Sequence, residues 1–260
     1  MTLSVQGLTI ELGGSRVVDG VSFDVPDGAR IGIIGESGSG KSLTALAIMG
    51  LLPHGARTTG SVRWNGREIL GIPDRELAKL RGSEIGMVFQ EPQTALNPIR
   101  RVGRQIAEAA RIHRGVRGRD ADGLAIELAR SVGLSRPEEI VRRYPHQLSG
   151  GQRQRVGIAA ALAADPRLII ADEPTTALDV TVQKGVLELL TRVVAERDAS
   201  LAFITHDLAV LAQVATHAIV MERGRIVEAG AVADLLTAPT HPVTRGLLND
   251  SKATLWRKHD

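Results

Sequence analysis

The sequence of 260 residues contains no cysteine, which excludes disulfide bonds, thiolate metal sites and cysteine nucleophiles. Its six aromatic residues (three Phe, two Trp and one Tyr) leave the core to aliphatic side chains and leave few flat groups to stack on a ligand. No apolar run reaches the roughly 18 residues that a membrane-spanning helix needs. The first residues show no basic segment followed by an apolar one, so we expect no secretory signal.

The composition that remains is that of an ordinary globular protein. Hydrophobic residues make up 43% of the chain, which suffices for a core and argues against disorder. The 32 basic and 29 acidic residues give a net charge of +3, which is too small to indicate nucleic-acid binding. One stretch is unbalanced, because seven arginines lie between Arg100 and Arg119. A solvated helix face is one interpretation of this stretch, and a surface facing a partner or a membrane is the other.

Strand patterns alternate with helix patterns along the chain. Alternating apolar residues predict strands at 3–11 and 21–25, and apolar runs predict buried strands at 30–34, 85–89, 167–171 and 201–205. Helices are predicted at 41–52, 74–81, 153–164 and 182–197, and a hairpin at 217–228 around Gly224. This order is typical of an α/β protein with a parallel sheet. The segment from about 97 to 144, rich in Arg, Ala and Glu, predicts a helical insertion.

A phosphate-binding motif occupies residues 35–42. Its letters, Gly-Glu-Ser-Gly-Ser-Gly-Lys-Ser, match G-x-x-x-x-G-K-[ST] at every fixed position, after a predicted strand and at the start of a predicted helix. The glycines let backbone N–H groups turn toward phosphate oxygens, and the helix N-terminus adds positive potential. We expect Lys41 to neutralise the β- and γ-phosphates and Ser42 to offer its hydroxyl to Mg²⁺.

Titratable side chains follow two more predicted strands. Asp172 and Glu173 end an apolar run, and adjacent residues of a strand point in opposite directions. We therefore expect Asp172 to bind Mg²⁺ and Glu173 to act as the general base for an attacking water. His206 follows the strand at 201–205, at an edge where ligands gather in open α/β sheets, so we expect it to contact the γ-phosphate.

A second glycine-containing segment, residues 148–152, precedes the helix predicted at 153–164. Ser149 or Gly150 would cap that helix, and two glycines would leave its first N–H groups accessible to an anion. The composition does not decide between a second phosphate site and a plain capped turn.

Taken together, these segments resemble the ATP-binding subunit of an ABC transporter over roughly residues 3–248. In this resemblance 35–42 is the Walker A motif, Asp172–Glu173 end the Walker B strand, and 148–152 is the signature. Gln90 resembles the Q-loop glutamine, 177–179 the D-loop, and His206 the switch histidine.

The resemblance implies a fold of class α/β. It is a P-loop NTPase core with a parallel sheet, an N-terminal antiparallel β subdomain and an inserted α-helical subdomain. The core would comprise 1–89 and 165–248, the helical subdomain about 97–160, and a short basic tail 249–260.

It also implies which residues act on the cofactors ATP and Mg²⁺. Catalytic roles fall to Glu173, His206, Gln90 and Lys41, and the Mg²⁺ ligands are Ser42, Gln90 and Asp172. The residues that contact ATP are Gly35, Glu36, Ser37, Gly38, Ser39, Gly40, Lys41, Ser42, Leu43, Ser149, Gly150, Gly151, Gln152 and Asp179.

Three segments, 89–98, 144–155 and 239–248, resemble the importer branch for oligopeptides, dipeptides and nickel. This implies three kinds of partner at the cytoplasmic face of the membrane: a second ABC ATPase subunit, identical or related, two transmembrane permease subunits, and indirectly a solute-binding protein. The second subunit would supply its signature to each ATP, and the permease would enter a groove beside Gln90. No nucleic-acid partner is expected. Peptides and nickel both remain open as the solute, and a soluble accessory ATPase of phosphonate breakdown is the alternative function.

The loop at 12–17 departs from the family pattern. Many relatives place a Tyr or Phe there to stack on adenine, and this loop has no aromatic residue. Stacking by Leu12 or Arg16 would be weaker, or cation–π in character. We therefore expect the phosphates to hold most of the ATP, with similar affinities for ATP and GTP.

Overall fold

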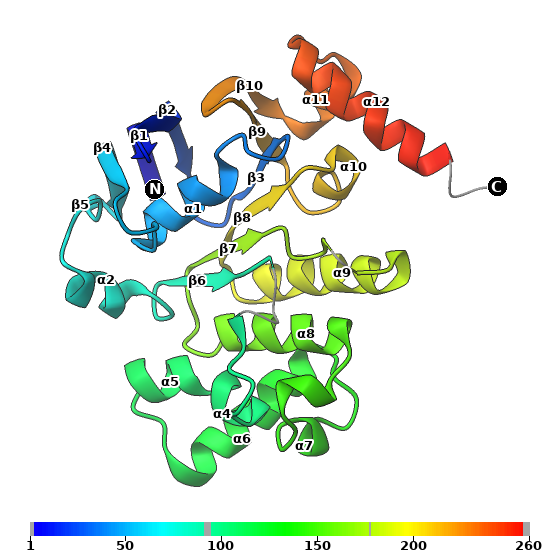
Figure 1. Cartoon of the computed structure of the whole chain (residues 1–260). Coiled ribbons are helices and arrows are strands. Elements are labelled where there is room, and N and C mark those ends of the chain that lie inside the picture. Colours follow the sequence, from blue (N-terminus) through cyan, green and yellow to red (C-terminus); the bar gives the residue numbers. More distant parts are fainter. Residues whose placement is uncertain (1–2, 91–94, 177, 257–260) are drawn as a thin grey trace. The chain divides into compact units, whose positions relative to one another are not determined.

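The computed structural model describes residues 3–90, 95–176 and 178–256, with side chains described as far as residue 251. The chain forms two compact units, one made of 1–77 with 200–260 and the other of 78–199 (Figure 1). Among the described helices, none combines the length and the apolar character that crossing a bilayer requires.

An antiparallel sheet opens the first unit, with strands in the order β2-β1-β4-β5. Its strands are β1 (Leu3–Leu12), β2 (Ser15–Val25), β4 (Arg57–Trp64) and β5 (Arg67–Glu68). The apolar residues of β1 that led us to predict a strand, among them Leu3, Val5 and Ile10, are fully buried. The N-terminal antiparallel subdomain is therefore confirmed, and β2 begins earlier than the strand predicted at 21–25.

The second sheet of this unit is mainly parallel, in the order β10-β9-β3-β8. It comprises β3 (Arg30–Gly35), β8 (Ser200–Thr205), β9 (His217–Glu222) and β10 (Arg225–Ala231). Strand β3 has a parallel neighbour on each side, and its aliphatic residues are buried. Among the described strands of this unit's sheet, β10 alone runs antiparallel, in the hairpin predicted around Gly224. The register sets Ile34 beside Thr205, so β3 and β8 end at the same edge.

Short helices complete the first unit. They are α1 (Lys41–Met49), α10 (Leu208–Leu211), α11 (Val232–Thr237) and α12 (Pro242–Trp256), and α2 (Asp74–Leu80) begins in this unit. A single carboxylate fixes the start of α12, because Glu228 on β10 accepts hydrogen bonds from Thr240, His241 and Thr244. Since α12 continues to Trp256, the tail boundary predicted at 248/249 falls inside a helix.

The second unit contains two parallel strands, β6 (Ile85–Val88) and β7 (Leu168–Asp172), and most of the helices. These are α4 (Val102–Ile106), α5 (Glu108–His113), α6 (Gly118–Ser131), α7 (Pro137–Ile140), the 3₁₀ helix Pro145–Gln147, α8 (Gly150–Ala161) and α9 (Val180–Glu196). Helix α8 is central, since α4, α5, α6, α9 and β6 all pack against it. The unit is larger than the helical subdomain predicted at about 97–160, because β6, β7 and α9 cluster with these helices.

Candidate functional site

The segment 35–42 forms a loop between β3 and α1, as the motif predicts. Gly40 is the N-cap of α1, and its φ of 99° is a left-handed conformation that favours glycine. The buried Lys41 donates from Nζ to the carbonyl oxygens of Gly35 and Glu36, both at 2.8 Å. Its ammonium group is thereby held inside the loop. Residues 36–38 are exposed, and Ser42 and Leu43 are half-buried in the first turn of α1.

His206 lies at the same edge of the first unit as the start of this loop. Ile34 and Thr205 are register partners in the parallel pair β3 and β8, so Gly35 and His206 follow neighbouring strand ends. The side chain of His206 is exposed, while the next residue, Asp207, caps α10 by accepting from Ala209 N at 2.8 Å. The prediction that this histidine belongs to the carboxyl edge of the sheet is correct.

In the second unit, β6 and β7 bring two predicted residues into contact. Val88 and Ala171 are register partners, and just beyond them Gln90 Nε2 donates to Glu173 Oε2 at 3.3 Å. The same carboxylate oxygen accepts a 2.8 Å hydrogen bond from Thr176 Oγ1. Thr176 belongs to no motif, so sequence reasoning did not identify it as a partner of Glu173.

The alternation argument for Asp172 and Glu173 needs correction. Strand β7 ends at Asp172, which is 6% exposed, and Glu173 has a φ of 42°. Glu173 is therefore in the left-handed region, not in an extended strand, and a non-glycine residue there carries some backbone strain. The two carboxylates are separated by this change of backbone direction, not by the pleat of a strand.

The signature segment forms a helix start with a reciprocal cap. Ser149 Oγ accepts from Gln152 N at 3.3 Å, and the Gln152 side chain accepts from Ser149 N at 3.0 Å. Glycines 150 and 151 begin α8, and a cavity of about 320 Å³ opens here, lined among others by Ser149, Gly151 and Gln152. The helix cap that both interpretations of this segment include is present, and the cavity leaves room for an anion at the helix N-terminus, so the structure is compatible with a second phosphate site as well as with a capped turn.

Asp179 lies beside this cavity and caps α9, since its carboxylate accepts from Val182 N at 2.9 Å. Thr181 and Val182, the next residues of α9, line the same cavity as the signature. The structure therefore brings the signature and the end of the predicted D-loop together within the second unit. Ala177 of that loop, and residues 91–94 after Gln90, lie outside the described residues.

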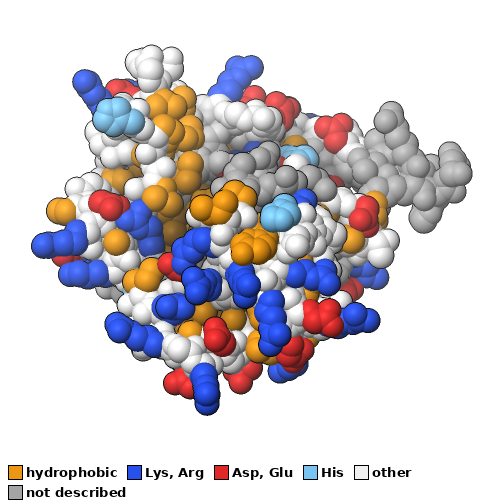
Figure 2. All heavy atoms as spheres, turned by 60° about the horizontal axis from the view of Figure 1, so that its bottom comes forward, with side chains coloured by type: hydrophobic (Ala, Val, Ile, Leu, Met, Phe, Trp, Pro, Cys, Tyr) orange, Lys and Arg blue, Asp and Glu red, His pale blue; other side chains and the backbone are white. Residues whose placement is uncertain are grey.

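The arginine-rich stretch contributes to a second, larger cavity in this unit, of about 650 Å³. Its lining includes Ile99, Arg100, Arg101, Arg104, Arg142 and Tyr144. Ile99 is 83% exposed, and Arg100 is 2.6 Å from Glu108, whereas Arg101, Arg104 and Arg142 form no ion pair with any residue that the structure describes. Figure 2, with the lower side of Figure 1 toward the viewer, shows basic side chains gathered next to hydrophobic ones on this face.

The predicted Mg²⁺ ligands have suitable chemistry, and they belong to different units: Ser42 to the first, Gln90 and Asp172 to the second. The hydroxyl of Ser42, the amide of Gln90 and the carboxylate of Asp172 offer oxygen, which hard divalent cations prefer. Within the described ranges, no three His, Asp or Glu side chains cluster as a metal cage.

Comparisons with known proteins agree with the predicted family. The family described as "ABC transporter" matches residues 18–176. A "Probable peptide ABC transporter ATP-binding protein y4tR" of Sinorhizobium fredii is 48% identical over 237 residues, which is 90% of this chain and 71% of that protein. An "Oligopeptide transport ATP-binding protein OppD" of Salmonella typhimurium is 46% identical over 91% of this chain and 71% of its own length. The chain spans a smaller share, 46%, of the "Peptidoglycan transport ATP-binding protein YejF" of Agrobacterium fabrum, with 48% identity.

Solved structures support the same assignment. A structure described as a dimeric post-hydrolysis state of the ATP-binding cassette MJ0796, bound to ADP and Pi, superposes with a TM-score of 0.79 at 29% identity. The match covers 88% of this chain and 98% of that one. The predicted P-loop NTPase fold is confirmed by this match. The chain belongs to the ATP-binding proteins of ABC transporters and is an ABC-type ATPase of the branch that includes the oligopeptide transport proteins.

Proposed function

We propose that this chain hydrolyses ATP to drive the import of peptides, as one of two ATPase subunits docked on the cytoplasmic side of a membrane permease. The observation that supports the proposal most directly is the Gln90–Glu173 hydrogen bond, because it joins the residue expected beside the permease groove to the residue expected to act as the general base. Support for peptides as the solute comes from the names of the relatives, which refer to oligopeptide transport.

The phosphate loop would bind the nucleotide of this subunit. Backbone N–H groups of 36–40 and the N-terminus of α1 would surround the β-phosphate, and Leu43 would contribute its backbone in the first turn. Lys41 is already held by the loop carbonyls, so its charge is in position before a phosphate arrives. Mg²⁺, when bound through Ser42, Gln90 and Asp172, would neutralise charge on the phosphate oxygens.

Hydrolysis would depend on Glu173. Its carboxylate is half-buried and can accept a proton from a water that attacks the γ-phosphate. In the structure, Oε2 of this base accepts hydrogen bonds from Gln90 and Thr176. His206 follows β8, which ends at the same edge of the sheet as β3 and the start of the phosphate loop. From there it would donate a hydrogen bond to a γ-phosphate oxygen.

The capped N-terminus of α8 would bind the ATP of the partner ATPase subunit. Its cavity presents the Ser149 hydroxyl and the first N–H groups of the helix, and both suit an anion. Asp179 would position the start of α9 beside that anion. A related cassette is dimeric in its post-hydrolysis structure, which supports pairing of two such subunits.

The cavity formed by α4, α6 and the segment 141–144 would receive a cytoplasmic segment of the permease. It combines the exposed Ile99 with the arginines that have no ion-pair partner among the described residues. Apolar and cationic groups together suit a helical protein segment that carries carboxylates. This favours the partner-surface interpretation of part of the arginine-rich stretch.

The test is Glu173→Gln, with Glu188→Gln as its control, because Glu188 is exposed on α9 and makes only a 3.9 Å ion pair with Lys184. We expect Glu173→Gln to retain ATP binding and to lower phosphate release about 100- to 10,000-fold. Light scattering should show an ATP-dependent dimer of this variant, and the control should behave as the unmodified chain.

Unchanged turnover of the Glu173→Gln variant in the assembled transporter would rule out this residue as the base. Import is tested separately, by co-expression with the permease and peptide uptake into vesicles. Stable association with soluble metabolic enzymes in place of a permease would overturn the transport assignment and favour an accessory ATPase.

A further inference from the structure

The loop at 12–17, in which the family resemblance implies an aromatic residue for many relatives, contains an exposed arginine in this chain. Arg16 is the second residue of β2, its side chain is 55% exposed, and it follows the turn at Gly13–Gly14. The loop at 12–17 contains no aromatic side chain. If this loop contacts the base of a nucleotide, a side chain of another kind must make the contact.

Backbone contacts fix Arg16 close to the phosphate loop. The carbonyl oxygen of the next residue, Val17, is 3.0 Å from the place that a Cβ on Gly40 would occupy. The turn at Gly224 is hydrogen-bonded both to the phosphate loop and to β2. Gly224 N donates to Ser39 O at 3.0 Å, and Asp19 N donates to Gly224 O at 2.8 Å. Residues 17–19 are thus bound to the phosphate loop, directly and through the hairpin, and Arg16 immediately precedes them.

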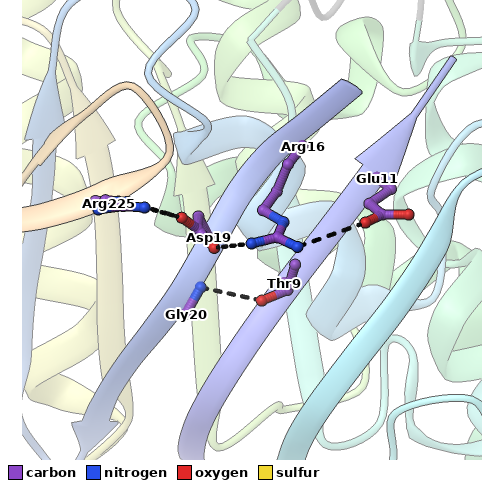
Figure 3. A network of polar contacts seen from close by, with 6 residues as sticks. All are labelled: Thr9, Glu11, Arg16, Asp19, Gly20 and Arg225. Carbon is purple, nitrogen blue, oxygen red and sulfur yellow. Dashed lines mark hydrogen bonds and ion pairs between the residues drawn. The ribbon is translucent and has the colours of Figure 1, made fainter. Parts of the chain in front are cut away.

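Two carboxylates orient the guanidinium of Arg16 (Figure 3). Its Nη1 donates to Asp19 Oδ1 at 3.0 Å, and its Nη2 is 3.9 Å from Glu11 Oε1. Asp19 in turn accepts from Arg225 Nε at 2.7 Å. The Arg225 hydrogen bond, aided by Arg16, holds the pKa of Asp19 below its ordinary value, so this carboxylate stays charged across the neutral range. These partners engage N–H groups, which lie in the guanidinium plane, and they make no use of its two faces.

We propose that Arg16 is the platform for the nucleotide base, stacking one face of its guanidinium on the purine ring. This inference rests on the proposed function, because it assumes that phosphates occupy the loop at 35–42. A guanidinium stacks on aromatic faces by cation–π attraction, and its fixation by Asp19 and Glu11 reduces the entropy lost on binding. Stacking does not distinguish one base from another by the hydrogen-bonding groups on its edge, since every base presents a π face. Adenine and guanine nucleotides therefore bind with similar affinity.

A phosphate contact is the competing role for an exposed arginine at this place. The two roles differ in what they require of the side chain. A phosphate contact needs positive charge, which lysine also supplies, whereas stacking needs a flat group, which lysine lacks and tyrosine has. Inorganic pyrophosphate separates them as well, because it offers phosphates without a base.

The experiment measures dissociation constants of ADP, GDP and inorganic pyrophosphate, none of which requires hydrolysis, with Mg²⁺ present. The variants of the full chain are Arg16→Ala, Arg16→Lys and Arg16→Tyr, with Arg75→Ala as control, because Arg75 is 88% exposed and has one ion pair at 3.8 Å. Arg16→Ala should weaken ADP and GDP binding about two- to fivefold and leave pyrophosphate unchanged. Arg16→Lys should match Arg16→Ala, Arg16→Tyr should bind ADP at least as tightly as the unmodified chain, and Arg75→Ala should have no effect.

Unchanged ADP affinity in Arg16→Ala would overturn the proposal. So would an equal loss for ADP and pyrophosphate that Arg16→Lys restores, which would identify a phosphate contact. These outcomes leave the ATPase function intact. Failure of the unmodified chain to bind ADP or pyrophosphate would instead refute the proposed nucleotide site itself.

Discussion

Replacing Glu228 by Gln should loosen the C-terminal helix of the first unit. Both carboxylate oxygens accept two hydrogen bonds: Oε1 from Thr240 N and Oγ1, each at 2.8 Å, and Oε2 from His241 N at 3.0 Å and from Thr244 Oγ1. An amide nitrogen in place of one oxygen would face two donors. Hydrogen bonds to a charged acceptor contribute about 1.5–3 kcal/mol each, so we expect a loss near 2 kcal/mol after local relaxation.

The pH dependence of this loss can be worked out from the same carboxylate. Burial acts to raise the pKa of Glu228, but the hydrogen bonds from Thr244, Thr240 and His241 outweigh it and lower the pKa from 4.5 to about 2. The unfolded chain takes up this proton first, so the stabilisation is complete above about pH 4.5 and disappears as the pH falls toward 2. Because the group is partly exposed, we expect solvent to limit its contribution to about 1–2 kcal/mol.

Denaturant unfolding followed by tryptophan fluorescence is the assay, since Trp64 and Trp256 both belong to the first unit. At pH 7 the Glu228→Gln variant should be about 2 kcal/mol less stable, and at pH 4 the difference should narrow by about 0.5 kcal/mol. Glu188→Gln should show neither effect. A difference below about 0.5 kcal/mol at pH 7, or one that does not change with pH, would refute the reasoning from these hydrogen bonds.

Two further substitutions test local geometry. Gly224→Ala should lower the free energy of unfolding by about 1–3 kcal/mol, because φ is 82° there and the added Cβ would be 2.6 Å from Val17 O. Gly230→Ala, which meets nothing within 4 Å, is the matched control in the same hairpin, and equal thermal stability of the two variants would contradict this account. Ser149→Ala removes the hydroxyl that caps α8 and should cost about 1 kcal/mol in thermal or denaturant unfolding. If stability is unchanged, water replaces this cap without loss.

Much of the site could be predicted because its signals are local. The phosphate-loop motif consists of eight consecutive residues, and the sequence predicts a buried strand before it and a helix after it. The structure contains this strand and this helix. The cap of α8 was likewise predictable, since a serine before two glycines and a glutamine is a sequence signature of a helix start. The hairpin around Gly224 followed from two apolar runs and a glycine.

Other features depend on contacts that no local pattern contains. The hydrogen bond from Gln90 to Glu173 joins residues 83 positions apart, and only the pairing of β6 with β7 brings them together. The left-handed backbone of Glu173 breaks the strand alternation that the sequence suggested. Glu228 on β10 accepts a hydrogen bond from Thr244 in α12, just after the Thr-His-Pro segment. This contact can be recognised only when it is known that β10 and the start of α12 lie together. The two units divide the chain at 77/78 and 199/200, and this division reflects packing between distant segments that no local pattern contains.

The contact between Arg225 and Asp19 spans 206 positions of the chain, and the first unit takes its strands from both termini. During synthesis on a ribosome, all of residues 78–199 are made before residues 200–260. The second unit can therefore fold while the first still lacks β8, β9 and β10. Until the hairpin at 217–231 is made, Asp19 lacks its contact with Arg225, and the N-terminal strands lack this hairpin as a packing partner, which leaves them accessible to chaperones and to neighbouring chains.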